Sequence, residues 1–193
     1  MVSEHPERIA GQPVNFATPG LWPSLKDPRL RILLRHWAAN RQGLMMPRSA
    51  LDPAALKICL PNAWLYRFLP AEDDFICTVS GEKVNSAWGC SLMGKRIDEI
   101  MPGNMIAFAT LAYRLILEMP AIQTSTRRIE PPDGIEQISE RLIVPLANDA
   151  GGPYGVLGVT LYSLGELPQL SRSDDVRDEA TFYPCAGLPS TLP

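Results

Sequence analysis

The 193-residue chain is 46% hydrophobic and 20% charged, a balance typical of a folded globular protein and unlike that of disordered or fibrous chains. Its formal net charge of −3 offers no basic excess to attract phosphate groups, so nucleic acid is not expected as a partner. The first residues are too polar for a signal peptide and no apolar run is long enough to cross a membrane, so we expect a cytoplasmic protein without a membrane partner.

Proline content and hydrophobic periodicity divide the chain into four segments. Prolines are concentrated near both ends, which predicts a proline-rich leader over residues 1–26 and an irregular C-terminal tail over 164–193. Between them we expect an N-terminal helical extension over 27–62 and a mixed core over 63–163.

The first strong helix signal is Asp27 followed by Pro28, a capping side chain before a residue whose fixed φ suits the first helical position. The helix is expected to continue to about Gln42. One face carries apolar residues at helical spacing: Leu30, Leu33, Leu34 and Trp37. This stripe can cover a sheet within the chain or pack against a second copy of it. A second signal, Asp52-Pro53, predicts a short helix that ends before Pro61.

The core begins with a predicted hairpin of two strands, Ala63–Leu69 and Phe75–Ser80. Glycines divide the following segment, up to Pro102, into short helical turns, and an apolar helix is expected over Asn104–Glu118. Three more strands are predicted after it, and together with the hairpin they make a five-stranded antiparallel sheet. They are Ala121–Ile129, Gln137–Leu146 and Tyr154–Tyr162.

This order of elements, two strands, short helices, a long helix and three strands, resembles a PAS sensor domain. The run Gly89–Ile100, with its Gly-Lys pair and closing apolar residue, is similar to the PAS pattern for the short helices. The stretch from His36 to Pro61 resembles the leader of a subfamily of small stand-alone bacterial PAS proteins. The resemblance covers about Lys26 to Tyr162. It implies an α+β, PAS-like five-stranded antiparallel sheet with flanking helices and an N-terminal helical extension.

The resemblance also implies a cavity between the sheet and the helices that holds a small molecule. The candidate pocket residues are Trp64, Tyr66, Cys77, Trp88, Met105, Phe108, Ala109 and Tyr113. The same side chains suit a packed core equally well, so both interpretations stay open. Arg48, in the connection after Pro47, is a candidate contact for the anion of a ligand, or else a brace between the extension and the domain.

The sequence lacks the residue patterns that flavin binding, heme binding or catalysis would require. A flavin photosensor of this fold carries its cysteine within an Asn-Cys-Arg-Phe-Leu run, whereas Cys90 lies in Trp-Gly-Cys-Ser. A heme version needs an axial histidine near the long helix, and the two histidines are His5 and His36. Heme, flavin and metal are therefore not expected, and neither is catalysis, because no base is positioned beside a nucleophile.

Our hypothesis from the sequence is a stand-alone cytoplasmic sensory or regulatory PAS protein. It binds a small ligand in its core cavity and signals through protein–protein contacts to a downstream signalling protein. A homodimer is expected, through the N-terminal helix or the sheet surface. The alternative is a ligand-free PAS-type interaction or dimerisation module, and the sequence does not identify the ligand.

Overall fold

The computed structural model describes residues 6–17, 20–101, 103–129, 137–162 and 176–189. At its centre lie five strands in the spatial order β5, β4, β8, β7, β6, and each neighbouring pair is antiparallel. The bounds are Asp74–Ser80 for β5, Ala63–Leu69 for β4, Pro153–Tyr162 for β8, Gln137–Ala147 for β7 and Ala121–Ile129 for β6. The five-stranded antiparallel sheet predicted from the sequence is confirmed.

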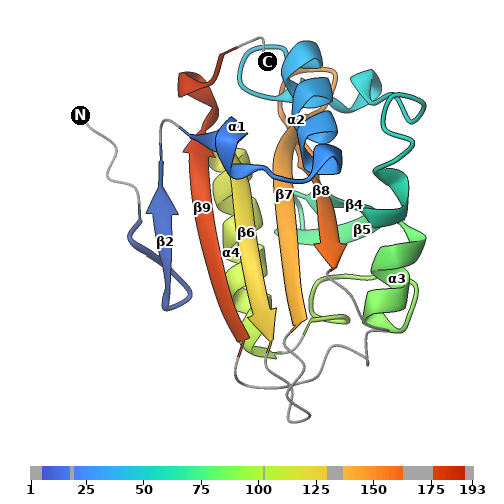
Figure 1. The fold of residues 1–193 in the computed structure, drawn as a ribbon, viewed down its shortest axis with the longest axis vertical. Helices are drawn as coiled ribbons and strands as arrows, with labels where there is room; N and C mark the ends of the chain where they lie inside the picture. The colour runs from blue at the N-terminus through green and yellow to red at the C-terminus, as the bar shows by residue number, and fades with distance from the viewer. Residues whose placement is uncertain (1–5, 18–19, 102, 130–136, 163–175, 190–193) are drawn as a thin grey trace.

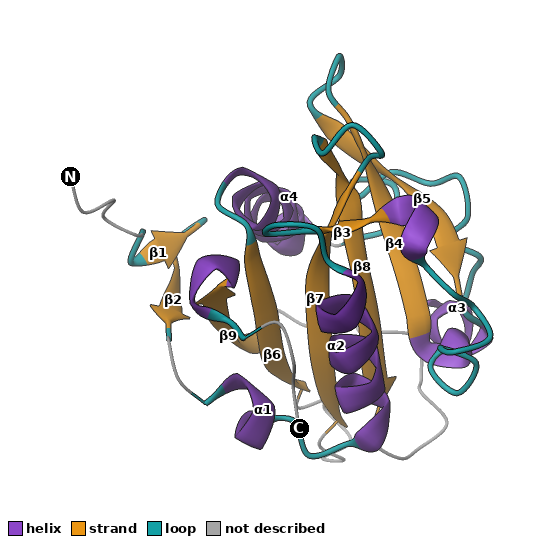
Figure 2. Ribbon diagram, turned by 90° about the horizontal axis from the view of Figure 1, so that it is seen from above, coloured by secondary structure: helices purple, strands orange, loops and turns teal. Residues whose placement is uncertain are grey.

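Both ends of the chain extend this sheet beyond β6. Strand β9 (Val176–Pro184) pairs antiparallel with β6, and β2 (Gln12–Phe16) pairs parallel with β9. A short strand β1 (Arg8–Ile9) turns back on β2 (Figure 2). The prediction of an irregular tail over 164–193 is wrong for 176–184, and the leader over 1–26 also contains strands. Residues 1–5, 18–19, 164–175 and 190–193 of these two segments lie outside the described residues.

The reason for this error is visible in β9. Its inward residues Ala180 and Phe182 are buried, and Phe182 stacks on Phe16 with ring centroids 5.4 Å apart. The alternation is short, and Pro184 closes it, so the sequence pattern alone gives a weak strand signal. Pairing with the exposed edge of β6 supplies the hydrogen bonds that a local pattern cannot show.

Helices cover both faces of the sheet (Figures 1 and 2). Helix α4 (Gly103–Glu118) and the shorter α3 (Glu82–Trp88) lie on one side, which we call the inner face. Helix α2 (Pro28–Asn40) lies on the other side, the outer face, with the four-residue helix α1 (Leu21–Ser24) beside it. Because side chains alternate along a strand, Trp64 and Tyr66 of β4 belong to the inner face and Leu65 to the outer face.

The start of α2 follows the predicted cap. The Asp27 carboxylate accepts the backbone N–H of Arg29 at 2.8 Å, and the Arg29 guanidinium binds both oxygens of the same carboxylate at 3.0 and 2.8 Å. These hydrogen bonds from Arg29, chiefly from its side chain, hold the pKa of Asp27 below its ordinary value. The helix ends at Asn40, two residues before the predicted end.

The apolar stripe of α2 is buried within its own chain. Leu30, Leu33, Leu34 and Trp37 are at most 2% exposed, and they pack on outer-face residues such as Leu142 and Val144 of β7. The Trp37 indole N–H donates to the carbonyl of Pro145 at 2.8 Å, which fixes the helix at one height on the sheet. The sheet therefore covers this stripe and leaves it unavailable to a second copy, whereas the expectation of a homodimer itself stays a prediction.

The connection between α2 and β4 runs across the outer face. Strand β3 (Met46–Pro47) pairs parallel with the end of β7 at Leu146, and the 3-10 turn η1 (Arg48–Ala50) follows it. The short helix predicted from Asp52 is a series of hydrogen-bonded turns, which leads into a second 3-10 turn, η2 (Leu60–Asn62). Prolines at both ends leave too few residues to nucleate a regular helix.

We expect Trp37→Phe to lower the free energy of unfolding by about 2 kcal/mol, because it leaves the buried carbonyl of Pro145 without a donor and removes apolar volume. Urea unfolding followed by circular dichroism measures this change. The matched control is Trp22→Phe: Trp22 is only partly buried, and its ring contacts the Arg31 and Arg35 guanidinium groups. Equal losses in the two variants would contradict the anchoring role of Trp37.

Candidate functional site

The inner face is built around a cluster of aromatic rings. Tyr113 of α4 stacks on Trp64 with ring centroids 5.6 Å apart, lies 5.8 Å from Tyr66 and meets Phe75 edge-on at 5.6 Å. Each of the four side chains is at most 4% exposed. Contacts of this kind are favourable beyond simple burial, so the cluster holds α4 firmly on the sheet.

Trp64 is held in place by a hydrogen bond and by the shape of its neighbour. Its indole N–H donates to the Thr160 hydroxyl at 2.9 Å, and the Arg141 Nε donates to the same hydroxyl at 3.2 Å. Its ring lies directly over Gly158 of β8, where an added Cβ would come within 2.1 Å of the ring. Glycine at 158 is therefore required by the close approach of the tryptophan.

The predicted pocket residues come together here, but little space remains between them. Trp64, Tyr66, Trp88 and Tyr113 line an inner cavity of about 20 Å³, together with Arg141 and Thr160. This is room for about one water molecule. Cys77, Met105, Phe108 and Ala109 are buried in the same structure without lining that cavity. In this conformation the inner face is a packed core.

The Tyr66 hydroxyl lies in this core at the expense of folding stability. It is buried, and no described residue hydrogen-bonds to it. Burial, followed by the neighbouring Tyr113 and Cys77, raises the pKa of Tyr66 well above its ordinary value, so the phenol stays neutral. An unpartnered buried hydroxyl destabilises the fold that contains it.

Three of the cysteines are buried thiols. Burial raises the pKa of Cys59 and Cys77 to about 11 and that of Cys185 to about 12. A thiol that stays protonated is a poor nucleophile and a poor metal ligand, so these side chains act as small apolar groups. Among the described residues no cluster of histidine, cysteine, aspartate or glutamate has the arrangement of a metal site.

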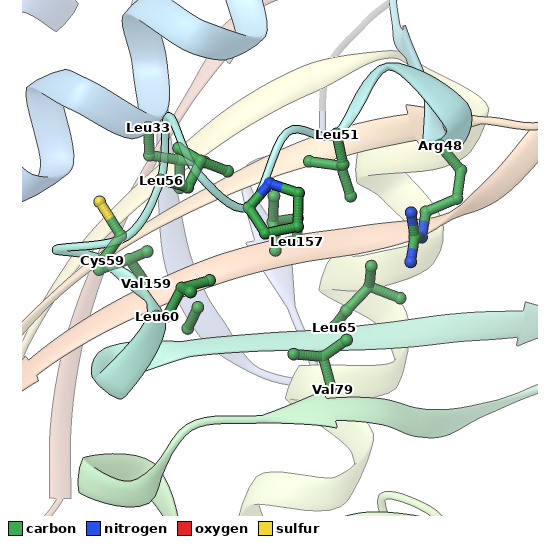
Figure 3. A pocket seen from close by; sticks show the side chains of 12 residues that line it. Leu33, Arg48, Leu51, Leu56, Cys59, Leu60, Leu65, Val79, Leu157 and Val159 are labelled. Atoms are coloured by element: carbon green, nitrogen blue, oxygen red, sulfur yellow. The ribbon is translucent and has the colours of Figure 1, made fainter.

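A larger apolar cavity lies on the outer face, between the connection that follows α2 and strands β4, β5 and β8 (Figure 3). Its volume is about 110 Å³. Apart from Arg48 its wall is formed by apolar side chains and one thiol. These are Leu33, Leu51, Pro53, Leu56, Cys59, Leu60, Ala63, Leu65, Val79, Leu157 and Val159. We call this space the outer cavity.

Of the described residues that form the wall of the outer cavity, Arg48 is the charged one. Figure 3 shows it extending from η1 toward the strands, at the end of the cavity opposite Cys59. Within the described part of the chain, no hydrogen bond or ion pair involves its guanidinium. The sequence singled out Arg48 as an anion contact or a brace. The structure places it at a cavity and gives it no carboxylate to brace against among the described residues.

The remaining wall of the outer cavity was not predicted. The sequence analysis searched the inner face, because the family resemblance places the pocket there. The available signal was the alternation of β4, which points Leu65 away from Trp64 and toward the face that α2 and its connection cover. Val79 gave no such signal: alternation places it with Cys77, and an irregularity in the β4–β5 register moves it to the outer face beside Leu65. The sequence pattern did not show how closely the connection packs on that face.

A third hollow, of about 400 Å³, is a polar groove beside α2 that spans β7, β6 and β9. Glu140, Thr126 and Glu179 lie in one row across these strands, and Lys26 also lines the groove. The sequence did not reveal this groove, because one of its walls is β9.

Comparison with known proteins gives matches at the level of structure only. No family model matches the chain, and no curated protein does. A structure of VqmA bound to DPO matches 57% of this chain and 56% of its own at 14% identity and a TM-score of 0.45. The structure of a Vibrio cholerae VqmA dimer matches 59% of this chain and 52% of its own chain, at 15% identity and a TM-score of 0.46. The PAS domain of a Colwellia psychrerythraea protein matches 57% of this chain and 96% of its own chain, at 16% identity and a TM-score of 0.39.

The fold is PAS-like. The element order predicted from the sequence is present, with the hairpin β4–β5 beside β8 and with β7 and β6 following. The chain spans about half the length of the VqmA chains that it matches.

One prediction about partners needs correction. Nucleic acid was excluded because of the net charge, yet a further structural match is a complex of VqmA with its ligand and DNA. Net charge sums over a whole chain and gives no information on a local contact surface, so the exclusion was wrong as an inference. As to membranes, none of the described helices is both long and apolar enough to span one.

We expect Tyr66→Phe to raise the free energy of unfolding by about 1 kcal/mol, because it removes a buried hydroxyl that has no described partner. Urea unfolding measures the change, with Tyr154→Phe as the control, since Tyr154 is only partly buried and its hydroxyl carries no such cost. A loss of stability in Tyr66→Phe would show that the hydroxyl is satisfied in solution.

Stability should fall in alkaline solution. In the unfolded chain thiols titrate near pH 9, whereas Cys59 and Cys77 in the folded protein titrate near 11. Between these values the unfolded state binds fewer protons, so the free energy of unfolding declines by about 1.4 kcal/mol per pH unit for each buried thiol. Below pH 9 these thiols contribute no slope. Urea unfolding from pH 7.5 to 11 should show the decline, and Cys77→Ala should make it shallower.

Proposed function

We propose that this protein is a sensory or regulatory PAS-like protein that binds a small, largely apolar ligand in the outer cavity and signals its occupancy through protein–protein contacts. The observation that carries the proposal is the outer cavity itself, about 110 Å³ of apolar space beside a packed inner core. An apolar cavity of about 150 Å³ is known to hold benzene, so this one suits a guest of similar or slightly smaller size.

The position of the cavity suggests how occupancy becomes a signal. Its wall joins three parts of the chain: Leu33 of α2, the connection over residues 48–60 and the outer face of the sheet. A guest that fills this space adds apolar contact between the extension and the sheet. It therefore stabilises the docked extension relative to any looser arrangement, and the difference in affinity between the two arrangements sets the size of the response.

The proposed role is binding rather than catalysis, and it requires neither heme nor flavin. The wall of the outer cavity has an apolar surface with a single charged group, and this suits holding a molecule better than transforming it. Cys59, the potential nucleophile in the wall, has its pKa raised to about 11 by burial and stays protonated at neutral pH.

A ligand-free interaction module is the second candidate, and the packed inner face favours it. The aromatic cluster leaves an inner cavity of only about 20 Å³, so the face where the family resemblance places a pocket holds no guest in this conformation. In that case the outer cavity would be a packing defect without a ligand. The two candidates differ in what a small apolar probe does to stability.

The test uses 1-hexanol as a neutral probe and thermal unfolding of the full chain. When hexanol is present at about ten times its dissociation constant, its binding should raise the midpoint temperature of thermal unfolding by about 3 °C or more. Ala63→Leu adds side-chain volume inside the outer cavity and should abolish the shift. Ala71→Leu, the same change in an exposed turn, should leave it intact.

Two results would count against the proposal. If hexanol raises the midpoint of neither the parent protein nor Ala71→Leu, the interaction module is the better interpretation. If the shift survives in Ala63→Leu, the probe binds elsewhere and the outer cavity is not the site.

A further inference from the structure

Arg48 places a positive charge at one end of the otherwise apolar outer cavity. We infer that the ligand is a small monocarboxylate, with its apolar body among the leucines and its carboxylate on the Arg48 guanidinium. This inference rests on the proposed function and narrows it to one ligand class.

The first argument is the guanidinium without a partner. Arg48 is partly buried and makes no hydrogen bond or ion pair with another described residue. Two nearby carboxylates are engaged with other groups: Asp52 accepts the backbone N–H of Ala54 at 2.8 Å, and Asp149 accepts the Ser49 hydroxyl. An arginine that faces apolar surface without a counter-ion is suited to receive one from outside the chain.

The second argument is the number of donors. A carboxylate carries one charge and matches the planar fork of a single arginine with two parallel hydrogen bonds. A phosphate group carries more charge and needs more donors when it leaves water, and among the described residues Arg48 alone brings a cation to this cavity. The surroundings of Arg48 therefore favour a carboxylate over a phosphate.

The third argument is the layout of the cavity from end to end. Arg48 stands at one end and Cys59 at the other, with leucine and valine side chains between them (Figure 3). The Cys59 thiol already donates to the carbonyl of Arg29 at 3.3 Å, so it offers no free donor to a ligand. A guest whose charged head lies on Arg48 and whose apolar tail has about five carbons fits this arrangement, because the tail alone is slightly smaller than the benzene that a cavity of about 150 Å³ holds.

The experiment compares hexanoate with 1-hexanol, two probes with the same tail and different heads. Isothermal titration calorimetry on the full chain should show hexanoate binding at least about tenfold more tightly, as expected for a charge-assisted pair. Arg48→Gln should remove this preference and leave the hexanol affinity within about twofold. Arg48→Lys should keep part of the preference, because it retains the charge without the planar fork.

The matched control is Arg67→Gln, which removes the same charge from an exposed position of β4 that does not line the cavity. It should bind both probes like the parent protein. Unchanged hexanol binding in Arg48→Gln shows that the cavity is still folded, so the loss of hexanoate preference reports the missing guanidinium.

The possible failures are distinguishable. Equal affinities for hexanoate and hexanol in the parent protein overturn the carboxylate assignment and leave the proposed function standing. A preference for hexanoate that survives Arg48→Gln, or that Arg67→Gln reduces equally, also overturns it, because the anion then binds elsewhere or responds only to net charge. Absence of binding for both probes overturns the proposed function itself.

Discussion

The fixed position of α2 on the outer face is the constraint on which the other features depend. The central sheet is apolar on both sides, with Leu142 and Val144 on one and Ile143 on the other, so one layer of helices cannot satisfy it. Helix α2 supplies the second layer, and the bond from the Trp37 indole to Pro145 sets its height. The chain must then return from the end of α2 to β4 across the outer face. That return path forms the roof of the outer cavity and carries Arg48.

The C-terminal part of the chain reinforces this arrangement from the other side. The Arg41 guanidinium, just beyond the end of α2, donates to the carbonyls of Cys185 at 3.0 Å and Leu188 at 2.6 Å. Cys185 follows directly after β9, whose pairing with β6 holds it in place. The extension and the end of the sheet therefore support each other, although more than 140 residues separate them in the sequence.

The sequence predicted those features that depend on residues close together in the chain. The Asp27-Pro28 cap, the apolar stripe of α2 and the period of β4 each lie within one segment, so their residues were sufficient to place them. Strand β9 was missed because its strand character comes from the edge of β6, which no local pattern reveals. Seven of the eight predicted pocket residues are buried and Trp88 is partly buried, yet whether a cavity remains among them depends on how Tyr113 fits between Trp64 and Phe75. Arg48 was selected from the sequence, whereas its apolar surroundings depend on the path of the connection.

The edge of the sheet beyond β6 is closed by both ends of the described chain, β9 from one and β2 from the other. Strand β2 lies over backbone groups of β9 that would otherwise face solvent, and such open edges invite pairing with other molecules. A shortened version that begins after Phe16 would keep the residues of the outer cavity but lose this cover, together with the buried Val14 and the Phe16 ring that stacks on Phe182. The backbone of β9 and the Phe182 ring would then both be uncovered, so the choice of N-terminal boundary governs how readily the protein associates with itself at high concentration.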